Sequence, residues 1–195
     1  MGITTQQMVG HTKRTRSKTM ANNQHYKTAS SRHGGRRRKM TEKYIITHED
    51  QMQLQSDIIR QMTRDGFLPD VIIGVSRGGL PIGVMFSHYY DTPFIPFKGS
   101  LRDHPNWESD WKLPSHWKIR NGKKRILITD DICDEGDTFA KIVEDISKAY
   151  PDANIKTCAL VQNKNKVFTV DYHGVTIDKS IKPLWVVFPC ENWWM

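Results

Sequence analysis

The sequence predicts an α/β domain over residues 41–195, with a mainly parallel sheet flanked by helices. Short runs of β-branched residues, such as DVIIGV at 70–75, suit strands that are buried on both faces. Segments with apolar residues at helical spacing alternate with these runs, and such alternation is typical of parallel sheets. The length of 195 residues fits one domain with an extension.

Residues 1–40 differ in composition from the rest of the chain. They contain ten Lys or Arg and no acid, whereas residues 41–195 contain nineteen bases and twenty-one acids. They also lack apolar periodicity, so we expect a disordered basic extension. Three interpretations stay open: a solvated extension with an older start at Met40, a segment that binds RNA or DNA by neutralising phosphates, or an organelle-targeting peptide.

Composition excludes some classes of protein. No apolar run approaches the roughly 20 residues that cross a bilayer, and the N-terminus lacks the apolar core of a secretory signal. Cys133, Cys158 and Cys190 are odd in number and widely spaced, which favours reduced thiols over a disulfide framework. We therefore expect a cytoplasmic protein with no membrane partner.

The first helix is predicted from a capping signal. Thr47 and Asp50 have the T-x-x-D spacing of a capping box. Gly66 and Pro69 end the helix. The residues expected on its inner face are Met52, Ile58, Ile59 and Met62.

The other elements follow from the same patterns. A glycine-rich segment, SRGGLPIG, opens a helix that reaches about Tyr90, and a second amphipathic segment predicts a helix over 138–150. Polar and aromatic residues at 98–122 predict a long loop or a small hood. The predicted strands are at residues 70–75, 93–97, 124–129, 155–161 and 184–189.

The segment ILITDDICDEGDT, residues 126–138, carries the strongest functional signal. Asp130 and Asp131 stand at the carboxyl end of a predicted strand, where parallel sheets bind ligands. Gly136 permits a tight turn, so that backbone amides at the start of the next helix can hold a phosphate. Adjacent carboxylates suit sugar hydroxyls or a divalent cation. Together they predict a sugar phosphate bound with a metal.

A second loop follows the strand at 70–75. In GVSRGGLP, the residues Ser76, Gly78 and Gly79 allow the backbone to approach an anion closely, and Arg77 adds donors matched to phosphate oxygens. Two such loops on one sheet suit a substrate with phosphates at both ends.

Residues 126–138 resemble the 5-phosphoribosyl-1-pyrophosphate (PRPP) signature of the type I phosphoribosyltransferases, whose fold is Rossmann-like. The resemblance implies that Asp130 and Asp131 engage the ribose hydroxyls and Mg²⁺, and that Asp134 is the acid/base near the purine. It also implies a 5′-phosphate loop made of Asp134, Glu135, Gly136, Asp137 and Thr138. Glu135 and Asp137 depart from the usual pattern, and we expect the Glu135 side chain to turn outward.

Other segments are similar to the xanthine-guanine and hypoxanthine enzymes of that family. Their pyrophosphate loop reads SRGGL, as residues 76–80 do, and EKYIIT at 42–47 looks like the start of the bacterial enzymes. The resemblance implies that Trp185 stacks on the base and that the Val186 carbonyl reads it. Near the position of a base-reading lysine the chain offers Gln162, Asn163 and Lys164, of which Lys164 is our prediction; Glu191 is a further candidate metal ligand.

These features together predict a purine phosphoribosyltransferase. It would transfer 5-phosphoribose from PRPP to guanine, xanthine or hypoxanthine with Mg²⁺, with adenine left open, and would form a homo-oligomer. Residues 98–122, with three tryptophans, would be a closing lid or a static hood. The alternative is a non-catalytic regulator that senses PRPP or a nucleotide and binds nucleic acid through the basic extension.

Overall fold

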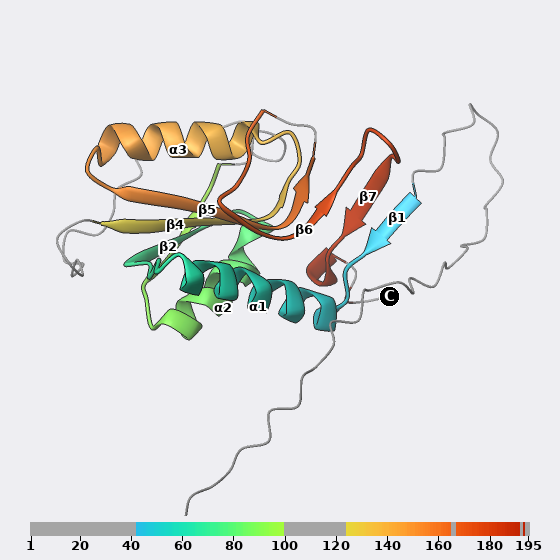
Figure 1. Cartoon of the computed structure of the whole chain (residues 1–195), viewed down its shortest axis with the longest axis horizontal. Coiled ribbons are helices and arrows are strands. Elements are labelled where there is room, and N and C mark those ends of the chain that lie inside the picture. The colour runs from blue at the N-terminus through green and yellow to red at the C-terminus, as the bar shows by residue number, and fades with distance from the viewer. Residues whose placement is uncertain (1–41, 100–123, 165–166, 192, 194–195) are drawn as a thin grey trace, which may run out of the picture. The chain divides into compact units, whose positions relative to one another are not determined.

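The computed structural model describes residues 42–99, 124–164, 167–191 and 193, and its main feature is a five-stranded parallel sheet (Figure 1). The predicted extension at 1–40 and nearly all of the predicted hood at 98–122 lie outside these residues. In spatial order the strands are β3 (Phe94–Phe97), β2 (Val71–Val75), β4 (Arg125–Cys133), β5 (Asn154–Asn163) and β6 (Tyr172–Ile177).

Helices cover both faces of this sheet. Figure 1 shows α3 (Asp137–Ala149) on one face, with α1 (His48–Arg64) and α2 (Gly79–Tyr90) on the other. Side chains alternate along each strand, so Ile72 and Leu127 pack with α1 and α2, whereas Ile73 and Ile128 pack with α3. The predicted α/β architecture is confirmed.

The strand order creates a crevice between β2 and β4. Helix α2 leads from β2 outward to β3, whereas α3 leads from β4 in the opposite direction to β5. The loops that leave β2 and β4 therefore diverge at a topological switch point, where parallel α/β sheets bind ligands. Both predicted anion loops leave the sheet at this point.

Helix α1 begins at the predicted capping box. The Thr47 hydroxyl accepts a hydrogen bond from the Asp50 backbone at 3.0 Å, and the Asp50 carboxylate accepts one from the Thr47 backbone at 3.1 Å. Ile58 and Met62 are fully buried as predicted, and Ile59 is half-buried. The prediction for Met52 was wrong, because this side chain is 60% exposed. The buried face of the helix instead includes Gln55, together with Ile58 and Met62.

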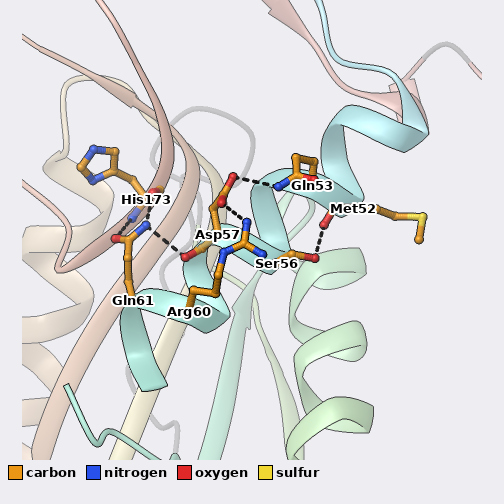
Figure 2. Close-up of polar contacts among 7 residues, drawn as sticks. All are labelled: Met52, Gln53, Ser56, Asp57, Arg60, Gln61 and His173. Carbon is orange, nitrogen blue, oxygen red and sulfur yellow. Dashed lines mark hydrogen bonds and ion pairs between the residues drawn. The ribbon is translucent and has the colours of Figure 1, made fainter. Parts of the chain in front are cut away.

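The same helix protects the free edge of the sheet (Figure 2). The Gln61 side-chain amide donates to the His173 carbonyl at 2.7 Å, and its oxygen accepts from the His173 backbone N–H at 3.4 Å. Tyr172 on the same strand donates to Asp65 at 2.9 Å. The two Gln61 contacts satisfy backbone groups on β6 that would otherwise be open to another strand.

A second, two-stranded sheet joins the two ends of the described domain. Strand β1 (Glu42–Ile45) pairs in parallel with β7 (Leu184–Val187), placing Lys43 opposite Trp185. The strand at 184–189 was predicted, but its expected place in the main sheet was wrong, since its partner is β1. Strands β1 and β6 were not predicted.

The cysteines and the helices give two further findings. Cys133, Cys158 and Cys190 are all free thiols, as predicted. Within the described residues, none of the helices combines the length and the apolar character needed to cross a membrane.

Candidate active site

A cavity of about 850 Å³ lies at the switch point between β2 and β4. Its lining residues fall within 76–81, 130–139 and 185–191, with Lys179 added from the turn after β6. The predicted residues of both anion loops therefore line one cavity, with the exception of Gly79, which is not among the lining residues. Trp185, Val186 and Glu191 line the same cavity.

The glycine loop, residues 76–79, lies directly against the end of β4. A Cβ atom at Gly78 would stand 2.1 Å from the Asp131 carboxylate, and one at Gly79 would stand 2.1 Å from the Thr129 carbonyl oxygen. The Thr129 hydroxyl also donates to the Gly79 carbonyl at 3.1 Å. Only glycines allow this approach, which places the exposed Arg77 beside the acid pair. The Ser76–Arg77 peptide bond is cis.

The two carboxylates at the end of β4 are electrostatically unfavourable. Burial and repulsion from Asp131 raise the pKa of Asp130 well above its usual value. Burial, followed by repulsion from Glu191, raises the pKa of Asp131 to about 6. The Asp131 backbone N–H donates to Asp130 at 2.9 Å, which offsets part of this cost. A bound cation or hydroxyl donor would relieve the repulsion.

These acids fit Mg²⁺ as the resemblance implies. Carboxylate oxygens are the ligands that Mg²⁺ prefers, and Mg²⁺ usually takes one or two carboxylates with water and substrate phosphates. The described residues contain no cluster of three or more acidic, His or Cys side chains arranged to hold a metal ion by themselves. Asp130 and Asp131 would therefore supply part of a coordination sphere. Glu191 is exposed, and its carboxylate accepts from the Phe188 backbone at 2.9 Å.

The phosphate loop, residues 134–138, is shaped by one glycine. Gly136 has a φ of +93°, and a Cβ atom there would stand 2.6 Å from the Cβ of Phe168. Gly136 is also the N-cap of α3, and no side chain caps the helix by a hydrogen bond. The first amides of α3 are therefore not satisfied by a capping side chain, a geometry suited to an anion.

Phe168 supports the phosphate loop from behind. Its ring stacks on Phe139 with centroids 5.9 Å apart and an interplanar angle of 5°. The neighbouring Val167 backbone donates to the Glu135 carbonyl at 3.2 Å. The side chains of Glu135 and Asp137 are exposed and Thr138 is half-buried. Exposure of Glu135 is compatible with the outward orientation, which stays a prediction because Glu135 also borders the cavity.

Asp134 is bound by two side chains, one from the end of β5 and one from the turn after β6. The Lys179 ammonium lies 2.5 Å from Asp134 Oδ2, and the Asn163 amide donates to Asp134 Oδ1 at 3.1 Å. Asn163 ends β5, and Lys179 lies in the turn after β6. Lys179 was not predicted, because β6, the strand that precedes it, was not predicted either.

One wall of the cavity comes from the small sheet. Trp185 is 49% exposed and faces the cavity lining, whereas Val186 is buried. Lys164 is exposed and does not belong to the lining, so the structure does not bring it to the cavity. Lys164 directly follows β5, whereas Lys179 is among the residues that line the cavity. The role of Lys164 in reading the base stays a prediction.

Comparison with known proteins identifies relatives of the chain. The family model described as phosphoribosyl transferase domain matches residues 47–191. A protein of Thermoplasma acidophilum named transcriptional regulator GfcR is 28% identical over 131 residues. That match covers 67% of this chain and 61% of the relative, so the chain spans less than two thirds of that protein.

Solved structures share the fold. A purine phosphoribosyltransferase from Pyrococcus horikoshii is 27% identical, with a TM-score of 0.57, covering 77% of this chain and 95% of that one. The Helicobacter pylori xanthine-guanine-hypoxanthine phosphoribosyltransferase is 19% identical, with a TM-score of 0.60 and the same coverage. A Neisseria gonorrhoeae hypothetical protein with bound ppGpp is 15% identical, with a TM-score of 0.59, covering 80% and 92%. The last two show the fold alone.

Proposed function

The chain belongs to the phosphoribosyl transferase domain family, and from this premise we propose that it is a purine phosphoribosyltransferase. It would transfer 5-phosphoribose from PRPP to a purine of the guanine, xanthine or hypoxanthine type, as in purine salvage. The observation that carries the proposal is the meeting of the glycine loop, the acid pair and the phosphate loop in one cavity with Trp185. The likeness to the Pyrococcus horikoshii enzyme supports the purine class.

Each part of PRPP has a chemically suited partner in the cavity. Backbone amides at the start of α3 and the Thr138 hydroxyl would hold the 5′-phosphate. Arg77 and the glycine loop would hold the pyrophosphate and stabilise the charge that it gains as it leaves. Asp130 and Asp131 would accept hydrogen bonds from the ribose hydroxyls.

Mg²⁺ is the cofactor that this proposal requires. Asp130 and Asp131 would hold it together with substrate oxygens, and Glu191 is a weaker candidate. When bound, Mg²⁺ would neutralise charge on the pyrophosphate and so make it a better leaving group.

Asp134 and Trp185 would act on the base. A purine ring nitrogen forms the new bond to C1′ as the bond to pyrophosphate breaks, and Asp134 would take the proton that the ring loses. The half-exposed indole of Trp185 would stack on the planar base, and the Val186 carbonyl would read its edge. The half-exposed state of Trp185 among the cavity-lining residues supports this role.

The test is a direct assay of the full chain. Purified protein, Mg²⁺ and PRPP are incubated with guanine, xanthine, hypoxanthine or adenine, and both nucleotide and pyrophosphate are measured. We expect turnover with at least one 6-oxopurine, and Asp134→Ala should lower it about 100- to 10,000-fold. Absence of turnover with every purine, in a protein that binds PRPP, would contradict the enzymatic proposal.

A second candidate function is non-catalytic regulation. Two observations favour it: the relative named a transcriptional regulator, and the ten basic residues within 1–40. In this case the cavity would sense PRPP or a nucleotide while the basic segment binds RNA or DNA.

Deletion of residues 1–40 separates the two candidates. For an enzyme, the deletion should leave turnover unchanged, whereas for a regulator it should abolish a nucleic-acid mobility shift. A salt titration of that shift provides the control, because phosphate contacts weaken steeply as salt rises.

A further inference from the structure

We propose that Lys179, held by Asn163, is a positioning residue for Asp134. In this role Lys179 sets the direction of the Asp134 carboxylate and balances its charge. The inference rests on the proposed function, in which Asp134 accepts the proton of the base. It assigns a role to two residues outside both predicted anion loops.

The contacts form a closed set across three adjacent strands. Lys179 and Asn163 each bind one oxygen of Asp134, at 2.5 Å and 3.1 Å. The Asn163 side-chain oxygen in turn accepts from the Lys179 backbone N–H at 3.2 Å. Both oxygens of the carboxylate are therefore bound, and its two partners are bound to each other. A carboxylate restrained at both oxygens has little freedom to rotate.

Both partners are themselves restrained. Asn163 is only 4% exposed, so its amide has no competing water. Lys179 lies in a turn fixed by the Asp178 carboxylate, which accepts from the Ser180 and Ile181 backbones at 3.0 and 3.4 Å. Such support from a second layer of residues gives the precise orientation that catalytic groups require.

Partial burial strengthens the ion pair. The side chains of Lys179 and Asp134 are 22% and 32% exposed. A charged pair that is shielded from water interacts more strongly than a surface pair, and loss of one partner leaves the other poorly compensated. The surface pair Lys182–Glu42, at 2.6 Å with 54% and 42% exposure, provides a matched contrast outside the cavity.

The activity experiment compares these two lysines in the full chain. Lys179→Met should lower kcat about 10- to 100-fold, because Asp134 loses its fixed direction, while KM for PRPP changes little. Lys179→Arg should restore part of the loss, since it keeps the charge and a donor. Lys182→Met should leave both constants unchanged. Wild-type kcat in Lys179→Met, with thermal denaturation showing a folded protein, would overturn the inference.

A double-mutant cycle separates positioning from simple damage. Asn163→Ala should lower kcat in the wild-type background, and should have little further effect once Lys179 is Met, because both changes release the same carboxylate. Fully additive losses would mean that the two residues act independently of each other and not through the shared Asp134 carboxylate. That result would overturn the proposal.

A chemical readout tests the contact without enzymatic activity. Limiting acetic anhydride is applied to the full chain, and modification of each lysine is followed by mass spectrometry. Lys179 should react more slowly than Lys182, and Asp134→Asn should accelerate Lys179 severalfold without affecting Lys182. Unchanged Lys179 reactivity in Asp134→Asn would overturn the inference. If wild type turns over no purine, the proposed function fails, and this labelling result still decides whether Lys179 holds Asp134.

Discussion

Carboxylates at the two ends of β4 are in opposite electrostatic situations. At the amino end, Asp70 meets Arg125, whose side chain donates to it at 3.0 and 3.2 Å and whose backbone donates at 2.9 Å. At the carboxyl end, burial raises the pKa of both Asp130 and Asp131, and repulsion from a neighbouring carboxylate raises each further: Asp131 acts on Asp130, and Glu191 acts on Asp131. At one end of β4 the carboxylate of Asp70 is therefore paired with a guanidinium group. At the other end, Asp130 and Asp131 lie together without such a partner among the described residues.

The amino end of β4 therefore contributes to stability, whereas its carboxyl end lies at the candidate site. The Asp70–Arg125 pair ties the start of β2 to the start of β4. The acid pair lowers stability, and its cost is relieved only when something else binds. Carboxyl groups in a cavity whose pKa is strongly shifted are candidates for ligand binding, because the protein does not balance their charge.

The largest effect is expected when the compensated end is broken. Arg125→Met leaves Asp70 buried without its guanidinium partner, so the free energy of unfolding should fall by about 3–5 kcal/mol. Urea denaturation measures this change. Turnover per folded molecule should be unaffected, because neither residue lines the cavity. A loss below about 1 kcal/mol, typical of a surface pair, would contradict the comparison.

The opposite sign is expected at the other end. Asp131 has its folded-state pKa raised to about 6, so Asp131→Asn should stabilise the protein above that pH by about 3 kcal/mol, at about 1.4 kcal/mol per pKa unit. Below about pH 4 the carboxyl is protonated in both folded and unfolded states, so the gain should vanish.

Thermal or urea denaturation between these pH limits gives the measurement for Asp131→Asn. The control is Asp152→Asn, an exposed site where the change should stay within about 0.5 kcal/mol at every pH. A gain that persists undiminished at low pH would show that relief of charge is not its cause.

The smallest effect concerns the contact between the glycine loop and the acid pair. Gly78→Ala places a Cβ atom 2.1 Å from the Asp131 carboxylate, and such overpacking should cost about 1–3 kcal/mol of stability. In an Asp131→Ala background the obstacle is gone, so the cost should shrink.

Gly66→Ala is the matched control for this prediction. Its Cβ would meet nothing within 4 Å, and its cost comes only from the φ of +64°, so it should be the same in both backgrounds. If Gly78→Ala were equally additive, the loop and the acid pair would not be in the contact described.

The parts of the site predicted from the sequence are those encoded locally. Asp130, Asp131 and the Gly136 turn belong to one short segment after a strand buried on both faces, and that segment alone indicates a ligand site. Lys179 was missed because it reaches Asp134 only through the order of β4, β5 and β6, which short-range patterns do not contain.

The same distinction explains the errors in the fold. Strands β2 and β4 were predicted because their β-branched runs are buried on both faces. Strand β6 was missed because it lies at the edge of the sheet, where half-exposed polar residues such as His173 interrupt the pattern. Met52 was placed wrongly because helical periodicity does not reveal where along its circumference the sheet makes contact.

The pairing of β1 with β7 has a consequence for the order in which the protein is built. All strands of the main sheet lie between Val71 and Ile177, so that sheet can form without residues 184–187. Strand β1 is made first but has to wait for β7, the last strand, before it is paired. Contacts so distant in sequence form late. We therefore expect the two predicted anion loops to come together first, and the wall that carries Trp185 to complete the cavity at the end.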